Sequence, residues 1–194
     1  MQAVDRCDVA WQAATIDVLP DVALLEIFAY YVNVNRTRTG ETKWHPLVHV
    51  CRKWRYVVFG SPLRLNLRLL CEASTLVRKT LSVWPLLPIV VLDEGYRKGV
   101  ENFIAALEHN DRICQLTLRD VSKSQYEKVL EAMQQPFPAL TDVDMEFPYI
   151  PPQPVIPASF LGGSAQPLKS LRLWGIPFPA LPKLLLSATH LVHL

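Results

Sequence analysis

The histidine and cysteine side chains that could bind a metal come closest together between His45 and Cys51. His45 and His49 are four residues apart, so a helix would place both on one face, as zinc-binding helices do. The residues between them supply no glutamate base, and Cys51 lies at another angle around such a helix. A second pair, His190 and His193, is terminal and predicted to be exposed. The sequence therefore predicts no metal site.

The sequence also lacks the motifs of acyl and phosphoryl transfer. Ser164 lies in Gly162-Gly163-Ser164-Ala165-Gln166. This differs from the Gly-x-Ser-x-Gly turn, in which glycines on both sides of the serine permit a tight bend. No glycine-rich loop followed by Lys-Ser or Lys-Thr is present to hold a phosphate. We therefore predict that the protein is not an enzyme and has no cofactor.

Composition narrows the class of protein further. Half of the 194 residues are hydrophobic and 20% are charged, which is enough for a sizeable core in one domain or in a small module plus a larger one. The net charge of +2 gives no reason to expect a nucleic-acid partner. The longest apolar run, 84–92, is far shorter than the roughly 20 residues of a membrane span. With four scattered cysteines and no signal-peptide pattern, we expect an intracellular protein, cytoplasmic or nuclear, without a membrane partner.

After a poorly specified lead-in at 1–14, the chain enters an unusually apolar helix. Pro20 can open it because the N–H that proline lacks would have no partner there, and Asp21 suits the positive end of the helix dipole. Two apolar stripes lie side by side on the helix: Val22, Leu25, Ala29 and Val32, and Leu24, Ile27, Phe28 and Tyr31. Since a surface helix usually buries one stripe, this helix is either a core helix or shared with a partner.

A second set of apolar residues follows with helical spacing: Leu47, Val50, Cys51, Trp54, Val57 and Val58. Together, Leu-Pro-x-x-x-Leu-Leu-x-Ile-Phe at 19–28, Val-Cys-Arg-x-Trp-Arg at 50–55 and Ser-Pro at 61–62 resemble the F-box of fungal-type F-box proteins. The F-box is a three-helix module that docks substrate receptors onto the Skp-type adaptor of cullin ubiquitin ligases. The predicted module spans 15–62, with a polar loop insertion at 33–44. It departs from the family at Leu63, where a tryptophan often follows Ser-Pro.

The resemblance implies which side chains would contact the adaptor. They are Leu19, Pro20, Leu24, Leu25, Ile27, Phe28, Val50, Cys51 and Trp54. Physically, an apolar helix pair would fill a groove on the adaptor, and its aliphatic and aromatic residues would supply most of the binding energy. The implied partners are the Skp-type adaptor, a cullin bound through it, and an unidentified protein target.

The region 63–194 follows a different pattern. Apolar residues alternate over 63–69, and the motif Leu-x-x-apolar-x-apolar begins near residues 87, 113, 140, 168 and 191, at intervals of 23 to 28 residues with helical patterns between. These intervals and motifs resemble irregular leucine-rich repeats. The expected fold is therefore α+β: a three-helix F-box module, then an irregular leucine-rich-repeat α/β solenoid. An ordinary α/β domain is the alternative, but it gives no reason for such even spacing.

Two further features of this region predict details of its structure. Five prolines in 148–157 suggest a stiff connector that replaces one repeat's helix, with an SH3-type ligand as the alternative. The last strand motif, at 191–194, is incomplete and has no polar cap, so the sequence predicts a chain truncated at its carboxyl terminus.

The solenoid would present outward-facing strand residues to the target. The candidates are Arg119, Asp144, Arg172 and Trp174, which are mixed in charge and do not identify the target. The predicted function is that of a substrate receptor of a Skp–cullin–F-box ubiquitin ligase. The alternative is an interaction protein whose amino-terminal helices only cap the repeats, in which case Leu24, Ile27 and Phe28 should be buried within the chain itself.

Overall fold

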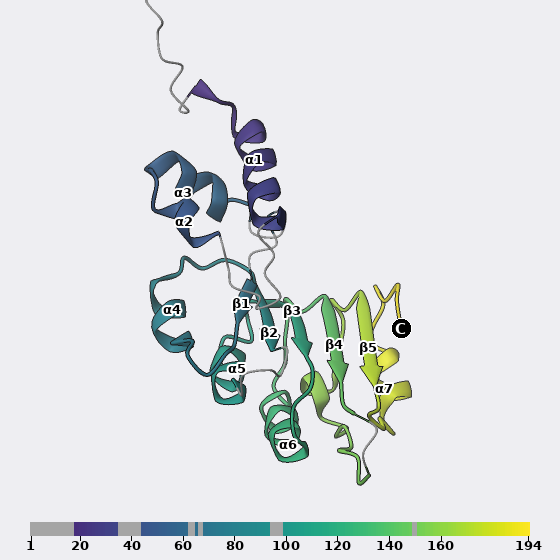
Figure 1. The fold of residues 1–194 in the computed structure, drawn as a ribbon. Coiled ribbons are helices and arrows are strands. Elements are labelled where there is room, and N and C mark those ends of the chain that lie inside the picture. Colours follow the sequence, from purple (N-terminus) through teal and green to yellow (C-terminus); the bar gives the residue numbers. More distant parts are fainter. Residues whose placement is uncertain (1–17, 35–43, 62–64, 66–67, 94–98, 149–150) are drawn as a thin grey trace, which may run out of the picture.

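A computed structural model describes residues 18–34, 44–61, 65, 68–93, 99–148 and 151–194. This part of the chain has an α+β fold with seven α-helices and one five-stranded parallel sheet, which confirms the predicted overall class (Figure 1). The lead-in, residues 35–43 of the predicted insertion and most of the predicted strand at 63–69 lie outside the described residues. Within the described ranges, no helix combines the length and apolar character needed to cross a membrane.

Three helices form the amino-terminal module: α1 (Asp21–Val34), α2 (His45–Val48) and α3 (Arg52–Phe59). As predicted, α1 begins directly after Pro20, whose carbonyl accepts the N–H of Leu24 at 3.1 Å. The helical spacing at 47–58 does not produce one continuous helix. Cys51 is extended, with φ of −155°, and its sulfur accepts the N–H of Trp54 at 3.5 Å, so it caps the amino end of α3.

The module has its own apolar core. Its buried members are Leu24, Leu25, Phe28, Trp44, Leu47, Val48, Val57, Val58 and Leu65. The ring of Phe28 lies 4.7 Å from that of Trp54, which joins α1 to α3. Leu65 comes from beyond residue 62, where the sequence placed the end of the module. Leu65 and Leu69 therefore belong to different cores, because Leu69 packs in the core of the sheet.

The five parallel strands follow the order of the chain. They are β1 (Arg68–Leu70), β2 (Ile89–Asp93), β3 (Ile113–Leu118), β4 (Asp142–Glu146) and β5 (Ser170–Trp174). The register between β2 and β3 shifts after Ile89, which leaves Cys114 as an additional residue in β3. Near the carboxyl terminus, His193 forms a single parallel bridge with Ser170, at the place where the sequence predicted the start of a further strand.

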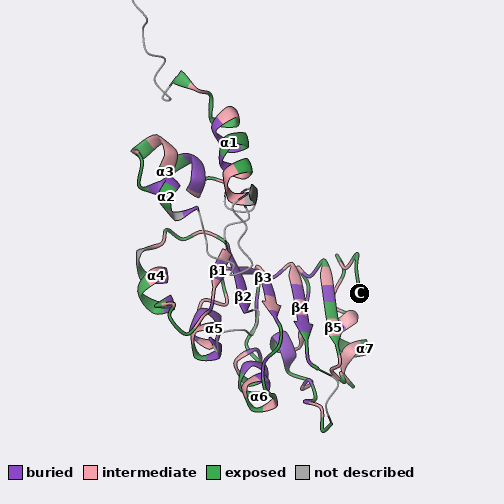
Figure 2. Ribbon diagram, in the orientation of Figure 1, coloured by how far each residue is buried: buried purple, intermediate pink, exposed green. Residues whose placement is uncertain are grey.

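Each parallel pair needs a crossover, and the crossovers carry the helices. These are α4 (Val77–Val83), α5 (Val100–Leu107) and α6 (Lys123–Ala132), with the 3-10 helix η2 (Phe160–Gly163) before β5 and α7 (Leu181–Leu185) after it. Between β4 and β5, the described residues of the proline-rich crossing form the 3-10 helix η2 and no α-helix. This agrees with the predicted connector that replaces a helix. Residues from all these helices and alternate strand residues share one core, so the helices cover one face of the sheet (Figure 2).

Close backbone packing fixes the position of α5 against the end of β1. A Cβ atom on Gly99 would collide with the carbonyl of Cys71, so glycine is required at this point. One turn later, the side-chain amide of Asn102 donates to the carbonyl of Glu72. Both contacts hold the first turn of α5 beside the segment that leaves β1.

The two cores meet at a pair of tryptophans. Trp84, just after α4, packs against both cores. Its ring centroid lies 5.1 Å from that of Trp44, whose own ring lies 6.0 Å from Phe59 on α3. This chain of rings connects the helical module to the sheet.

Candidate protein-binding surfaces

The sheet face opposite the helices is the first candidate surface. The register places Arg68, Val90, Gln115, Asp142 and Ser170 in one row across the sheet. The next row consists of Leu70, Leu92, Thr117, Asp144 and Arg172. The face therefore changes from apolar residues on β2 to carboxylates on β4 and a cation on β5. Because all the described crossover helices pack on the other face, the polar side chains on β3 to β5 reach solvent here.

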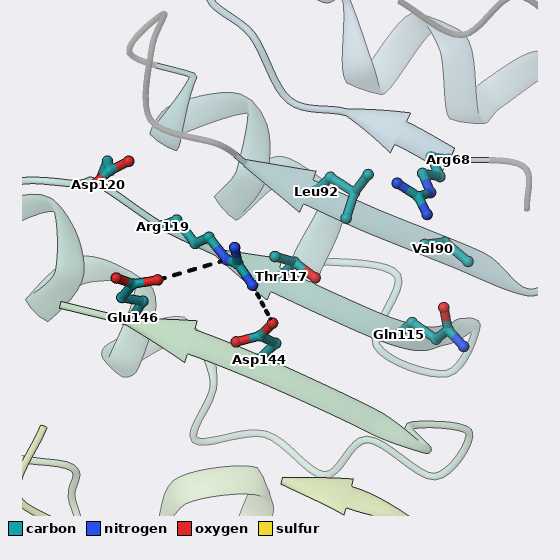
Figure 3. A pocket seen from close by; sticks show the side chains of 9 residues that line it. All are labelled: Arg68, Val90, Leu92, Gln115, Thr117, Arg119, Asp120, Asp144 and Glu146. Carbon is teal, nitrogen blue, oxygen red and sulfur yellow. Dashed lines mark hydrogen bonds and ion pairs between the residues drawn. The ribbon is translucent and has the colours of Figure 1, made fainter. Parts of the chain in front are cut away.

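A hollow of about 430 Å³ lies over the middle of this face (Figure 3). It is lined by Arg68, Val90, Leu92, Gln115, Thr117, Arg119, Asp120, Asp144 and Glu146. Two cationic side chains therefore oppose three anionic ones, above a floor that is apolar on β2. This mixture of charges and hydrogen-bonding groups suits a polar protein segment better than a small apolar ligand.

Arg119 forms ion pairs with two carboxylates of the hollow. Its Nη2 atom lies 2.6 Å from Oδ2 of Asp144, and its Nε atom lies 3.9 Å from Oε2 of Glu146 (Figure 3). The side chain of Arg119 is 46% exposed, so water weakens both ion pairs. These pairs can consequently be exchanged for contacts with a bound protein at little cost.

The structure brings the four predicted target-binding residues to this face. Arg119 pairs with Asp144, and Asp144 is the register partner of Arg172. Trp174 lies opposite Glu146 in the same register, and its side chain is 69% exposed. All four thus belong to one continuous surface over β3, β4 and β5. Whether they bind a target stays a prediction.

The four predicted residues leave out five other polar residues of the hollow: Arg68, Gln115, Thr117, Asp120 and Glu146. Strand alternation could have identified Gln115 and Glu146, since each is two residues from an outward-facing position. Asp120 adopts φ of +53° just after β3. No periodicity indicates that conformation, because it depends on the turn rather than on the strand.

The second candidate surface is the outer face of α1. Its apolar members are Val22, Ala23, Ile27 and Tyr30. Ile27 is four residues after Ala23, and Tyr30 is three residues after Ile27 and eight after Val22, so the four share one side of the helix. Val22 is 63% exposed, Ile27 is 46% exposed and Tyr30 is 71% exposed. Glu26 is the charged residue among them. An outer face so rich in large apolar side chains is typical of a surface that binds another protein.

The predicted adaptor-binding residues divide into three groups. Leu24, Leu25 and Phe28 are buried in the module's own core. Leu19, Cys51 and Trp54 are half-buried, and the carbonyl of Leu19 accepts Nζ of Lys53 at 2.7 Å. Pro20, Ile27 and Val50 are exposed. Only the third group, together with the unpredicted Val22 and Tyr30, offers substantial free surface to a partner. Whether the nine residues bind an adaptor stays a prediction.

Burial raises the pKa of two thiols and one phenol. Burial raises the pKa of the Cys71 thiol, and the neighbouring carboxylate of Asp93 raises it further. Burial also raises the pKa of the Tyr126 phenol and, chiefly, that of the Cys114 thiol. Cys71 and Tyr126 lie in the core between the sheet and its helices, whereas Cys114 packs with Val90 and Leu92 on the open face.

The metal candidates from the sequence are described only in part. His49 is exposed, Cys51 caps α3, and the side chain of His45 lies outside the description. Across the described ranges, no three His, Cys, Asp or Glu side chains gather as a metal site requires.

Comparison of the chain with models of known families, with curated proteins and with solved structures finds no match. The two surfaces are therefore interpreted from their own side chains and from the sequence motifs.

Proposed function

We propose that the protein is a non-catalytic substrate receptor of a Skp–cullin–F-box ubiquitin ligase, active in the cytoplasm or the nucleus. The observation that supports this most is the outer face of α1, where Val22, Ile27 and Tyr30 expose apolar side chains that the chain's own core does not use. The Leu-Pro motif and the Cys-Arg-x-Trp motif flank this face in the sequence, as the F-box resemblance implies.

In this proposal, the buried and exposed residues of α1 have different roles. Leu24, Leu25 and Phe28 hold α1 against α3, so they present the outer face in a fixed orientation. Pro20 and Ile27 then contact the adaptor, with Val22 and Tyr30 beside them. Burial of large aliphatic and aromatic side chains in a groove is the usual source of affinity in helix-in-groove recognition.

The target would bind to the open face of the sheet, which we propose to be an irregular leucine-rich repeat. Its strands begin 21 to 29 residues apart and pair in the order of the chain, as stacked strand–helix units do. The mixed charges around Arg119 and the exposed Trp174 favour a protein segment that supplies both charged and aromatic contacts.

A second function has an observation in its favour. Leu24 and Phe28 have no exposed surface, and the module joins the sheet through Trp44 and Trp84. Both features are expected if the helices only cap a repeat protein that binds targets without a ligase. The exposure of Ile27, 46%, is what this alternative leaves unexplained.

Co-expression with a Skp-type adaptor followed by size-exclusion chromatography separates the two functions. We expect a one-to-one complex for the wild type. Ile27→Asp should weaken binding by about thirtyfold or more, because a carboxylate would lose its water in the apolar contact without gaining a partner. This position is preferable to Leu25→Asp, since Leu25 is only 8% exposed and its charge would disrupt the module's core.

The matched control is Leu186→Asp, which makes the same kind of change at an 86% exposed leucine just after α7. It should leave the complex intact. A folded wild-type protein that does not bind the adaptor, or a complex unchanged by Ile27→Asp, would contradict the ligase function and favour the capping alternative.

A further inference from the structure

A second hollow, also of about 430 Å³, lies where the helical module meets the sheet. Its lining residues are Arg52, Arg55, Tyr56, Phe59, Gly60 and Pro85. Five of them come from α3 and its end, and Pro85 comes from the segment just after α4, which lies below α3 in Figure 1. None of these residues belongs to the outer face of α1 or to the open face of the sheet.

Ring contacts and hydrogen bonds hold the walls of this junction hollow in place. Phe59 packs against Trp44, and Trp44 packs against Trp84, so three aromatic rings support one wall. The guanidinium group of Arg112 fixes the opposite wall, because it donates to the carbonyl of Pro85 at 2.7 Å and to that of Leu87 at 3.1 Å. A hollow with fixed walls loses little conformational entropy when it binds a ligand.

The rim of the junction hollow is cationic. Arg52 and Arg55 are exposed, and none of the described residues that line the hollow carries a carboxylate. The Nε atom of Arg55 donates to the carbonyl of Val48 at 3.0 Å, which orients the side chain but leaves its terminal amino groups without a carboxylate partner among the described residues. Tyr56, 75% exposed, directly follows Arg55 in the sequence and also lines the hollow.

We propose that the junction hollow binds an acidic protein segment through one aromatic or aliphatic side chain flanked by carboxylates. The apolar side chain would rest against Phe59, Tyr56 and Pro85, and the carboxylates would pair with Arg52 and Arg55. The charge of the rim selects this occupant over a basic or neutral segment, since arginine binds carboxylates through two hydrogen bonds at once. Tyrosine and arginine are also the residues most enriched where binding energy concentrates. This site goes beyond the proposed ligase function and does not depend on it.

Fluorescence anisotropy with the full chain tests the site. The probe is a fluorescein-labelled twelve-residue peptide with one central phenylalanine between glutamates. Two comparison peptides replace the phenylalanine with alanine or the glutamates with lysines. We expect saturable binding of the probe, with both comparison peptides weaker by about tenfold or more, because each lacks one of the two contacts.

Two variants locate the binding on the protein. Arg52→Glu and Tyr56→Ala should each weaken the probe by about five- to tenfold, because they remove a rim charge and an exposed aromatic wall. Both positions are exposed, and circular dichroism should show an unchanged fold. The matched control is Lys169→Glu, which makes the same change of charge at an exposed residue before β5, outside the junction hollow.

Three results would overturn the proposal. The first is the absence of saturable binding up to about 1 mM protein. The second is equal weakening by Lys169→Glu and Arg52→Glu, which would show that only the net charge of the protein matters. The third is equal affinity for the lysine-flanked peptide, which would show that the rim does not select carboxylates. None of these results bears on adaptor binding by α1.

Discussion

The buried hydroxyl of Tyr126 offers a direct test of the packing between α6 and the sheet. Tyr126 has no exposed surface, and among the described residues none accepts a hydrogen bond from its hydroxyl or donates one to it. Its ring lies 5.5 Å from that of Phe147 in an edge-to-face arrangement. The substitution Tyr126→Phe removes the hydroxyl and keeps the ring. We therefore expect the variant to be more stable than the wild type.

The size of the effect follows from two opposing terms. A buried polar group without a hydrogen bond destabilises a protein by about 1–3 kcal/mol, and the substitution removes this penalty. The missing oxygen leaves a void of roughly 15 Å³, which costs about 0.4 kcal/mol at roughly 24 cal/mol per Å³. The contact with Phe147 persists because the ring is unchanged. The net gain is about 1–2 kcal/mol, or roughly 2–8 °C in Tm for a chain of this size.

Urea unfolding followed by circular dichroism measures the difference, with Tyr30→Phe as the matched control. Tyr30 is 71% exposed, so its hydroxyl stays in water and its removal should change the free energy of unfolding by no more than about 0.5 kcal/mol. A loss of about 1 kcal/mol or more in Tyr126→Phe would show that the hydroxyl has a hydrogen-bond partner. Equal effects of the two substitutions would show that Tyr126 is not enclosed. Either result would refute this account of the core.

Three further predictions concern the backbone, pH and the open face. Gly99→Ala should lower the free energy of unfolding by about 1–3 kcal/mol or more in urea titrations, because the new Cβ collides with the carbonyl of Cys71. Burial and Asp93 raise the pKa of Cys71 above its ordinary value of 9.0, so the folded state keeps a proton that the unfolded state loses. Stability should therefore be constant well below pH 9 and fall above it, with a smaller fall in Cys71→Ala. Arg119→Gln should change stability by less than about 1 kcal/mol in thermal melts, because its pair with Asp144 is half-exposed.

Most of the sheet and its helices could be predicted from apolar spacing alone. The third strand, 113–118, has the predicted bounds. Ser122 and Ser124 could each cap the next helix by residue type, and Ser122 is the cap of α6, with its N–H bonded to Oε1 of Gln125 at 3.0 Å. The predicted starts of β4 and β5 are each two residues early. Leu140 and Leu168 are buried, but their N–H groups bond within turns before the strands begin. Apolar spacing reports burial, whereas the start of a strand depends on pairing with a neighbour.

The division of α1 into an inner and an outer face could not be predicted from the sequence. Two adjacent apolar stripes give the helix no polar side, so periodicity cannot show which stripe turns inward. Long-range contacts decide this. Val57, Val58 and Leu65 approach α1 from later in the chain and enclose Leu24 and Phe28. By contrast, strand alternation placed the polar residues of β4 and β5 on the open face correctly, because a sheet covered on one face can leave the other in water.

A receptor that presents a target to a ligase has to hold two binding surfaces at a fixed separation. In this chain, the outer face of α1 and the open face of the sheet belong to different cores, so a mobile link would let them drift apart. The contact between Trp44 and Trp84, at 5.1 Å, joins the two cores with bulky rings that have few rotamers. The junction hollow lies beside this contact and shares Phe59 with its ring chain. A segment bound in the junction hollow would contact Phe59, which packs against Trp44. Its binding would therefore also affect the contact that sets the distance between the two surfaces.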